Sequence, residues 1–174
     1  MTPPDDPDEE TRASTDRNGL AHLQSDISPD LYRDAVGVVI GMQDHIDSTY
    51  STRRLLEEAF TAYCVELEDH YNDGRRWAPA TQITRGGIDP TARAVGKSLK
   101  PLQSWIEIGV RDRCYGTVNG MKKAASPTFT LRDLVESALN RHIDHLRRTH
   151  NGFDWEPQDQ PRRGRRGRPN IPME

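Results

Sequence analysis

The chain has 174 residues, of which only 33% are apolar, and its mean hydropathy is −0.86. No stretch approaches the roughly 20 apolar residues that a membrane span requires, and the first residues lack the charged-then-apolar pattern of a secretory signal. We therefore expect a cytoplasmic protein with no membrane partner. The formal net charge of −3 conceals an acidic beginning and an arginine-rich end.

The first 18 residues are acidic, contain proline and carry almost no apolar side chains. Such a segment cannot bury enough apolar surface to offset the entropy lost on ordering. We therefore predict a disordered acidic tail over residues 1–18.

An internal repeat organises the rest of the chain. Residues 50–79 return about 79 positions later as residues 129–157, and glycines four residues apart and a Trp-x-Pro motif recur with them. A shared helical period cannot place these residues in the same order twice, which indicates a duplication. The predicted divisions are a degenerate first repeat over 19–85, a linker over 86–102, a second repeat over 103–152 and a basic tail over 153–174.

Each repeat should end in a long amphipathic helix. In the second copy, apolar residues recur at steps of three and four from about Thr130 to His150. Thr130 with Asp133 predicts a capping box at its start, and the Asn-Gly pair at 151–152 predicts its end. The first copy repeats the apolar stripe and stops at Asn72.

A shorter helix should precede each long one. Apolar spacing predicts it over about Arg111–Ala124 in the second copy. In the first copy, Ser28 and Pro29 supply a cap and a first-turn proline. Gly116 and Gly120 each cost the helix up to about 1 kcal/mol relative to alanine. Their four-residue spacing, kept in both copies, suggests a close crossing of two helices.

A strand should stand before the first helix of each repeat. Ile106, Ile108 and Val110 alternate as in a half-buried strand over residues 104–110, and residues 22–27 are the candidate in the first copy. A lone strand leaves its backbone groups unpaired, so the two copies should pair antiparallel. The expected fold is mainly α with a short antiparallel β-ribbon, built from two β-α-α repeats with disordered termini. The linker is long enough for an intrachain pseudo-dimer, and a homodimer is the alternative.

The second copy resembles a known family at residues 128–135, 138–139, 150–152 and 166–169. These segments are similar to the ribbon-helix-helix DNA-binding proteins and, within that fold, to the centromere-binding ParB-like proteins of actinobacterial plasmids. The resemblance covers about the last 70 residues, with an echo over 28–87. It implies a tandem ribbon-helix-helix protein that binds double-stranded DNA in plasmid partition and represses its own operon. A ParA-like Walker ATPase is the implied partner, with nucleoid or plasmid association in the cytoplasm.

Other functions remain open beside this one. An antitoxin or a transcriptional repressor of the same fold carries the same helix pattern. A helical dimerisation module with a basic tail would bind DNA without choosing a sequence, and its affinity would collapse uniformly with salt.

The outer face of the predicted ribbon holds the first candidate DNA contacts. Strand parity turns Trp105, Glu107 and Gly109 outward in the second copy, and His22, Gln24 and Asp26 outward in the first. In this fold that face enters the major groove, where Gln24 could pair with adenine and Glu107 with a cytosine amino group. The alternative is an edge ribbon kept soluble by its charges.

The start of each long helix is the next candidate. Free backbone amides there point toward phosphate, with hydroxyl groups beside them. The candidate phosphate contacts are Thr128, Thr130 and Arg132 in the second copy and Thr49, Ser51 and Arg53 in the first. Ordinary helix capping is the alternative explanation of these hydroxyl groups.

The most specific local motif is the arginine-rich run over residues 162–169, which resembles the AT-hook with its Arg-Gly-Arg-Pro core. Narrow A·T-rich minor grooves concentrate the negative potential that attracts arginine. The candidate contacts are Arg163, Arg165, Arg166, Gly167 and Arg168. A generic solubilising tail is the alternative. The acidic residues 1–18 could compete with DNA for these arginines or contact the ATPase, and a solvating tail is the simpler interpretation.

No chemistry beyond binding is indicated. The sequence shows no nucleophile paired with a base and no phosphate-cradling glycine loop, so we expect neither an enzyme nor a cofactor. His142, His145 and His150 lack a fourth ligand for zinc, and we expect no metal. Cys64 and Cys114 fall on apolar helix faces and are interpreted as buried free thiols, with a disulfide or a metal pair as the alternative.

Overall fold

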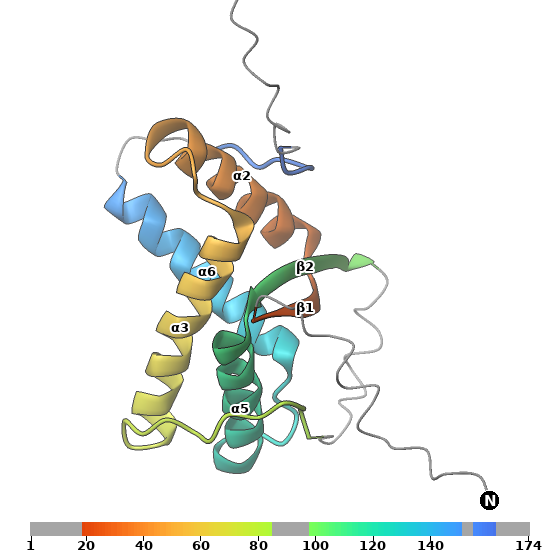
Figure 1. Cartoon of the computed structure of the whole chain (residues 1–174), viewed down its shortest axis with the longest axis vertical. Helices are drawn as coiled ribbons and strands as arrows, with labels where there is room; N and C mark the ends of the chain where they lie inside the picture. Colours follow the sequence, from red (N-terminus) through yellow and green to blue (C-terminus); the bar gives the residue numbers. More distant parts are fainter. Residues whose placement is uncertain (1–18, 85–97, 151–154, 163–174) are drawn as a thin grey trace, which may run out of the picture.

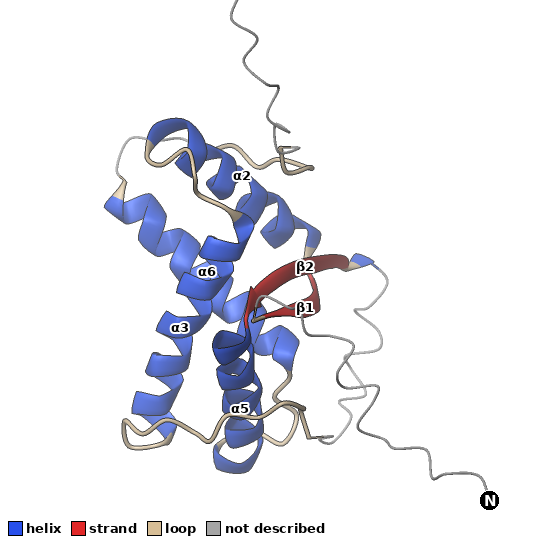
Figure 2. Cartoon of the chain, viewed as in Figure 1, coloured by secondary structure: helices blue, strands red, loops and turns tan. Residues whose placement is uncertain are grey.

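Two strands and four helices make up the described part of the chain. The computed structural model describes residues 19–84, 98–150 and 155–162 (Figures 1 and 2). The elements follow the order β1 (Leu20–Ile27), α2 (Pro29–His45), α3 (Thr52–Tyr71), β2 (Lys100–Glu107), α5 (Ile108–Ala124) and α6 (Leu131–Thr149). The order strand, helix, helix thus occurs twice. The predicted acidic tail, residues 86–97 of the predicted linker and residues 163–174 of the basic tail lie outside the described residues.

Capping residues mark the starts of α2 and α6 and the end of α3, as predicted. Helix α5 begins at Ile108, before the predicted Arg111, and the Asn-Gly pair predicted to end α6 lies outside the described residues. Ser28 Oγ accepts a hydrogen bond from the N–H of Leu31, and a proline occupies the first turn of α2. Thr130 and Asp133 form the predicted capping box at α6, and α3 ends at Asn72. Because these residues satisfy backbone groups that a helix end leaves free, they fix the helix boundaries.

The two strands pair antiparallel into a ribbon, as expected. The register places Gln24 opposite Gln103 at its centre. These two glutamines are 79 positions apart, the offset of the internal repeat, and each lies within the sequence Leu-Gln-Ser-x-Ile, at 23–27 and at 102–106. An approximate two-fold axis therefore passes between them and relates the two repeats of one chain.

The second strand differs from its predicted position. It runs from Lys100 to Glu107, so it begins inside the predicted linker, while Ile108 and Val110 lie in the first turn of α5. The spacing of Ile106, Ile108 and Val110 misled the prediction because short apolar runs fit a strand and a helical turn equally well. The core face of the strand is Leu102 and Ile106 instead.

One apolar core lies between the ribbon and the helices. Helix α3 lies against α6 and α5, and α2 lies against α6. The predicted apolar stripes of α3 and α6 point into this core. Fully buried side chains come from both repeats: Leu23, Ile27, Leu55, Leu56, Phe60, Ile106, Leu134, Val135 and Leu139. Since both repeats fill one cluster, neither has a separate core, as expected for units of about 50 residues.

Two loop segments, here called straps, interlock the repeats. The first strap (residues 77–84) crosses α5 and the second strap (residues 155–162) crosses α2, so each strap packs on the other repeat (Figure 1). The N–H of Ala80 donates to the carbonyl of Asp112 at 3.0 Å, and that of Gln158 donates to Arg33 at 3.1 Å. These are equivalent positions in the two repeats, so the approximate symmetry includes the straps.

The repeated glycines serve the straps rather than a helix crossing. A Cβ atom on Gly41 would collide with the indole of Trp155, and one on Gly120 would collide with that of Trp77. A Cβ atom on Gly37 would strike the backbone of the second strap in the same way. The sequence-based expectation of two crossing helices is therefore wrong, because the partner of each glycine pair is a Trp-x-Pro segment.

Cys64 and Cys114 are free and fully buried, as interpreted from the sequence. Their thiols interact with each other between α3 and α5, and the hydrogen bond to Cys64 together with burial raises the pKa of Cys114. None of the helices in the described ranges combines the length and the apolar character needed to cross a lipid bilayer.

Candidate functional site

The outer face of the ribbon is a surface to which both repeats contribute equivalent residues. Gln24 and Asp26 of β1 and Gln103, Trp105 and Glu107 of β2 are exposed on it, while His22 and Pro101 complete the face. Alternate residues of the same strands are buried in the core, so strand parity alone decides this division. The outward positions predicted for His22, Gln24, Asp26, Trp105 and Glu107 match the structure.

The centre of this face is a pair of carboxamides. Gln24 and Gln103 lie directly opposite each other on the approximate two-fold axis. Each carboxamide offers one acceptor and two donors side by side. Gln103 stands just before the strand predicted over residues 104–110, so the sequence analysis missed it, although the repeated Leu-Gln-Ser-x-Ile segment marks it as the equivalent of Gln24.

The two halves of the face carry different side chains. In one half, here called the aromatic half, His22 lies opposite Trp105 with ring centroids 5.3 Å apart. In the other, here called the acidic half, Asp26 lies opposite Pro101. The symmetry therefore holds at the centre of the face and breaks on either side of it.

Gly109 does not lie on the ribbon face as predicted. It occupies the first turn of α5, where the helical backbone has replaced the expected strand. It lies nevertheless beside two other predicted residues, because Arg53, Glu107 and Gly109 line one hollow at the end of the ribbon. The structure thus brings these three candidates together at the end of the ribbon rather than on its outer face.

The predicted hydroxyl contacts are occupied within the protein. Thr130 donates through both its N–H and its hydroxyl to Asp133, which fills the helix end with a carboxylate. Thr49 donates in the same way to Asp47. Ser51 caps α3 by accepting from a backbone N–H. The hydroxyl of Thr128 hydrogen bonds to that of Ser126. Helix capping therefore accounts for Thr130 and Ser51, and hydrogen bonds within the preceding loops account for Thr49 and Thr128.

Arg53 and Arg132 hold two equivalent networks across the repeats. The N–H of Ser28 donates to Glu136 Oε1 at 2.9 Å, and the N–H of Glu107 donates to Glu57 Oε1 at the same distance. Arg53 pairs with Glu57 at 2.8 Å, and Arg132 pairs with Glu136 at 3.1 Å. Each arginine thus positions a carboxylate that caps the first helix of the other repeat.

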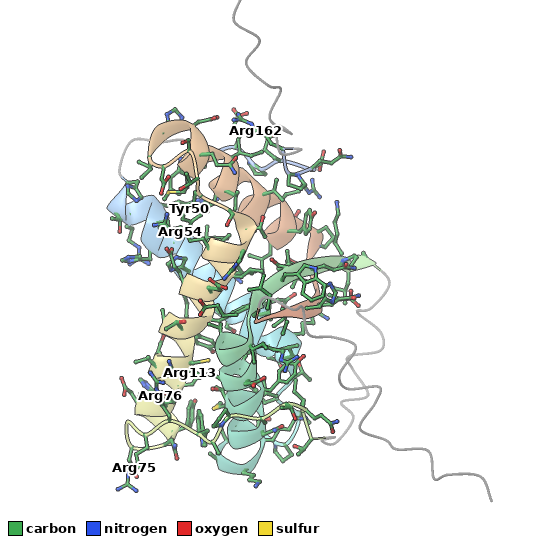
Figure 3. The ribbon with its side chains drawn as sticks, in the orientation of Figure 1. Tyr50, Arg54, Arg75, Arg76, Arg113 and Arg162 are labelled. Carbon is green, nitrogen blue, oxygen red and sulfur yellow. The ribbon has the colours of Figure 1, made fainter. Side chains whose placement is uncertain are left out.

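The arginines of the body are largely neutralised by carboxylates. Arg75, which points away from the end of α3 in Figure 3, and its neighbour Arg76 have no carboxylate within 4 Å among the described residues. The Arg162 guanidinium lowers the pKa of Asp44 through a hydrogen bond. The other pairs are Arg53–Glu57, Arg54–Asp47, Arg111–Asp112, Arg113–Glu68, Arg132–Glu136, Arg141–Glu66 and Arg147–Asp34. Among the described residues, Arg75, Arg76 and Arg148 form no such pair. The candidates Arg163, Arg165, Arg166, Gly167 and Arg168 lie outside the described residues.

A second hollow lies between α3 and α6, lined by four equivalent pairs of residues. Its charged groups already have partners: Arg141 pairs with Glu66 and covers the Tyr63 ring, and His142 Nε2 lies 3.2 Å from Glu58. Among the residues that the structure describes, no three histidine, cysteine or carboxylate side chains gather closely enough to hold a metal ion. The ribbon face therefore remains the stronger candidate site.

Comparison of the chain with models of known protein families, with curated proteins and with solved structures finds no match.

Proposed function

We propose that the chain is a tandem ribbon-helix-helix protein that binds double-stranded DNA through the outer face of its ribbon. The observation that supports this most directly is the exposed pair Gln24 and Gln103, which two repeats of one chain place opposite each other. A single chain then presents the ribbon that a dimer of shorter chains would otherwise build.

The size and chemistry of this face suit the major groove. The groove is about 12 Å wide and accepts a two-stranded ribbon. Glutamine pairs with the N6 and N7 edge of adenine through its two adjacent polar groups. Because the two glutamines are related by the approximate axis, each faces one DNA strand. The expected site therefore has an adenine on each strand near its centre.

Electrostatics assign the two parts of the protein different tasks. Asp26 and Glu107 on the ribbon face repel phosphate, and the arginines of the body are mostly paired. General affinity for DNA must then come largely from the arginine-rich residues 163–168, which add salt-dependent binding by displacing counterions. The ribbon contributes the choice of sequence, and the run of arginines contributes attraction, with a preference for A·T-rich minor grooves.

The biological role that we propose is a centromere-binding adaptor for plasmid partition that represses its own operon. Its support is the resemblance of residues 128–135 and 166–169 to the ParB-like family. A ParA-like Walker ATPase is the proposed partner. Stimulation of such an ATPase by the full chain on its DNA site tests this role, and an unchanged ATPase rate contradicts it.

Selection from random duplexes tests DNA recognition. The full chain enriches a sequence, and its affinity for that duplex is then titrated at two salt concentrations. The Gln24→Ala/Gln103→Ala variant should bind the selected duplex at least about tenfold more weakly, since one good base contact discriminates by about 1–3 kcal/mol. Its affinity for unrelated duplexes should not change.

The matched control is Asn140→Ala, which removes an exposed carboxamide from α6. It should bind like the wild type. If no sequence is enriched, and affinity falls with salt equally for every duplex, the chain is instead a helical module with a non-specific basic tail.

A further inference from the structure

We infer that the protein binds its duplex in one fixed orientation, because the two halves of the ribbon face carry different chemistry. This inference rests on the proposed function and adds the shape of the target, a site whose two halves differ. The approximate axis between Gln24 and Gln103 makes the comparison direct, since each residue on one side has an equivalent on the other.

The aromatic half presents an apolar edge next to the central glutamines, with the carboxylate of Glu107 beyond it at the end of the ribbon. Trp105 is 44% exposed, although large apolar side chains are normally buried, and His22 packs against it from the facing strand. The contact holds the indole in place before any partner arrives, so little entropy is lost on binding. An apolar side chain at a major-groove face contacts the methyl group of thymine, which the other bases lack.

The acidic half presents an acceptor. Asp26 is exposed where Trp105 lies in the other half, because both follow the serine of the Leu-Gln-Ser-x-Ile segment. Its neighbour across the ribbon is Pro101, which has no N–H. A carboxylate accepts a hydrogen bond from the amino group of cytosine and is repelled by the acceptor edge of guanine. The two halves therefore favour different base pairs.

Turning the protein around on its site exchanges these two contacts. The axis superposes the position of Asp26 on that of Trp105, so reversal sets the carboxylate against the thymine and the indole against the cytosine. Both contacts are lost together, while the central glutamines are unaffected. The reversed complex should be weaker by about tenfold or more, given the usual discrimination of a base contact.

The straps reinforce the same polarity. The second strap passes beside the acidic half, where Lys100 Nζ lies 3.5 Å from the carbonyl oxygen of Asp159 and Arg33 lies 3.8 Å from its carboxylate. In the sequence, the arginine-rich run follows this strap after Arg162, whereas the first strap continues into a linker with few cations. The chain therefore joins its main positive charge to the body through the strap beside the acidic half.

Three duplexes and three forms of the full chain test the inference. The duplexes are the selected site and the two palindromes made by reflecting either of its halves. The proteins are the wild type, Trp105→Asp and Asp26→Trp, each of which makes the two Leu-Gln-Ser-x-Ile segments identical. Fluorescence anisotropy gives the dissociation constants, and circular dichroism melting confirms that each variant is folded. Since both positions are exposed, either variant alone suffices if the other is unstable.

The wild type should bind the selected site at least about tenfold more tightly than either palindrome. Trp105→Asp should shift its preference toward one palindrome and Asp26→Trp toward the other. The inference is overturned if the wild type binds a palindrome as tightly as the selected site, or if both variants shift their preference toward the same duplex. Neither result contradicts sequence-specific binding. A separate result would contradict the proposed function: the Gln24→Ala/Gln103→Ala variant binding the selected site as tightly as the wild type. That result would overturn the inference as well.

Discussion

The indole of Trp155 packs directly on the Cα atom of Gly41, at the point where the second strap crosses α2. The side chain of a larger residue at position 41 would occupy the space of the ring. Gly41→Ala should therefore destabilise the protein by about 1–3 kcal/mol, although alanine itself favours the helix. Chemical denaturation measures the change, and tryptophan fluorescence reports displacement of the strap.

Gly109→Ala is the matched control for this substitution. Gly109 also lies in a helix, but a Cβ atom there would meet no heavy atom within 4 Å. The variant should be as stable as the wild type or more stable by up to about 1 kcal/mol. An equal loss of stability in both variants would contradict the role of the strap.

Glu136 joins the two repeats by accepting the N–H of Ser28. Glu136→Ala leaves that N–H without its partner and should cost about 1 kcal/mol or more, whereas Glu136→Gln keeps an acceptor oxygen and should cost less. Arg147→Ala breaks an exposed ion pair with Asp34 and should cost at most about 0.5 kcal/mol. Urea denaturation of the three variants distinguishes a capping role of Glu136 from an effect of surface charge. An equal loss of unfolding free energy in all three variants would refute the capping role.

Asp47 links the stability of the loop between α2 and α3 to pH. Hydrogen bonds from Thr49 and Arg54 lower its pKa from 3.8 to about 2. A lowered pKa in the folded state stabilises the protein above about pH 4, and this contribution disappears as the pH falls toward 2. The difference in melting temperature between the wild type and Asp47→Asn should therefore shrink over this range. Thr49→Val, which removes the hydroxyl donor, should reduce the same pH dependence. If the melting temperatures of the wild type and Asp47→Asn differ by a constant amount from pH 5 to 2, Asp47 does not contribute this pH dependence.

Cys64 and Cys114 should resist thiol reagents in the native protein. Both are buried, so a reagent reaches neither thiol unless the core opens. Their mutual hydrogen bond raises the pKa of Cys114 and lowers that of Cys64, so burial is what protects Cys64. Their reaction should be more than about a hundredfold slower than in denaturant, because it requires opening of the core. The Ile46→Cys variant supplies an exposed reference thiol, since Ile46 is 43% exposed. If Cys64 and Cys114 react as fast as this reference thiol in the native protein, they are not buried between α3 and α5.

Sequence patterns predicted the helices well because helix ends and helix faces are set by local residues. The capping box of Thr130 and the apolar stripe of α6 depend on neighbours within a few positions. The strand was misplaced because Ile106, Ile108 and Val110 fit both a strand period and a helical period, and Gln103 was missed because it precedes the strand predicted over residues 104–110. Comparing the two Leu-Gln-Ser-x-Ile segments would have corrected both errors.

The candidate site was predicted less completely because its chemistry depends on contacts between repeats. Glu57 and Glu136 lie one helical turn after Arg53 and Arg132, so the sequence alone places each arginine beside a carboxylate. Only the fold reveals that each carboxylate also accepts a backbone N–H from the other repeat. The glycines and the Trp-x-Pro motifs were visible as repeats, but nothing local indicates that each meets the other copy. The sequence patterns therefore did not predict contacts between residues that are far apart in the chain.

Photocrosslinking from the centre of the ribbon tests the central proposal most directly. A benzophenone amino acid replaces Gln103 in one protein and Asn140 in another, and each is irradiated on the selected duplex. The account predicts crosslinks from position 103 to bases at the centre of the selected duplex and none from position 140. Crosslinks of equal yield from both positions, or from position 140 alone, would contradict it.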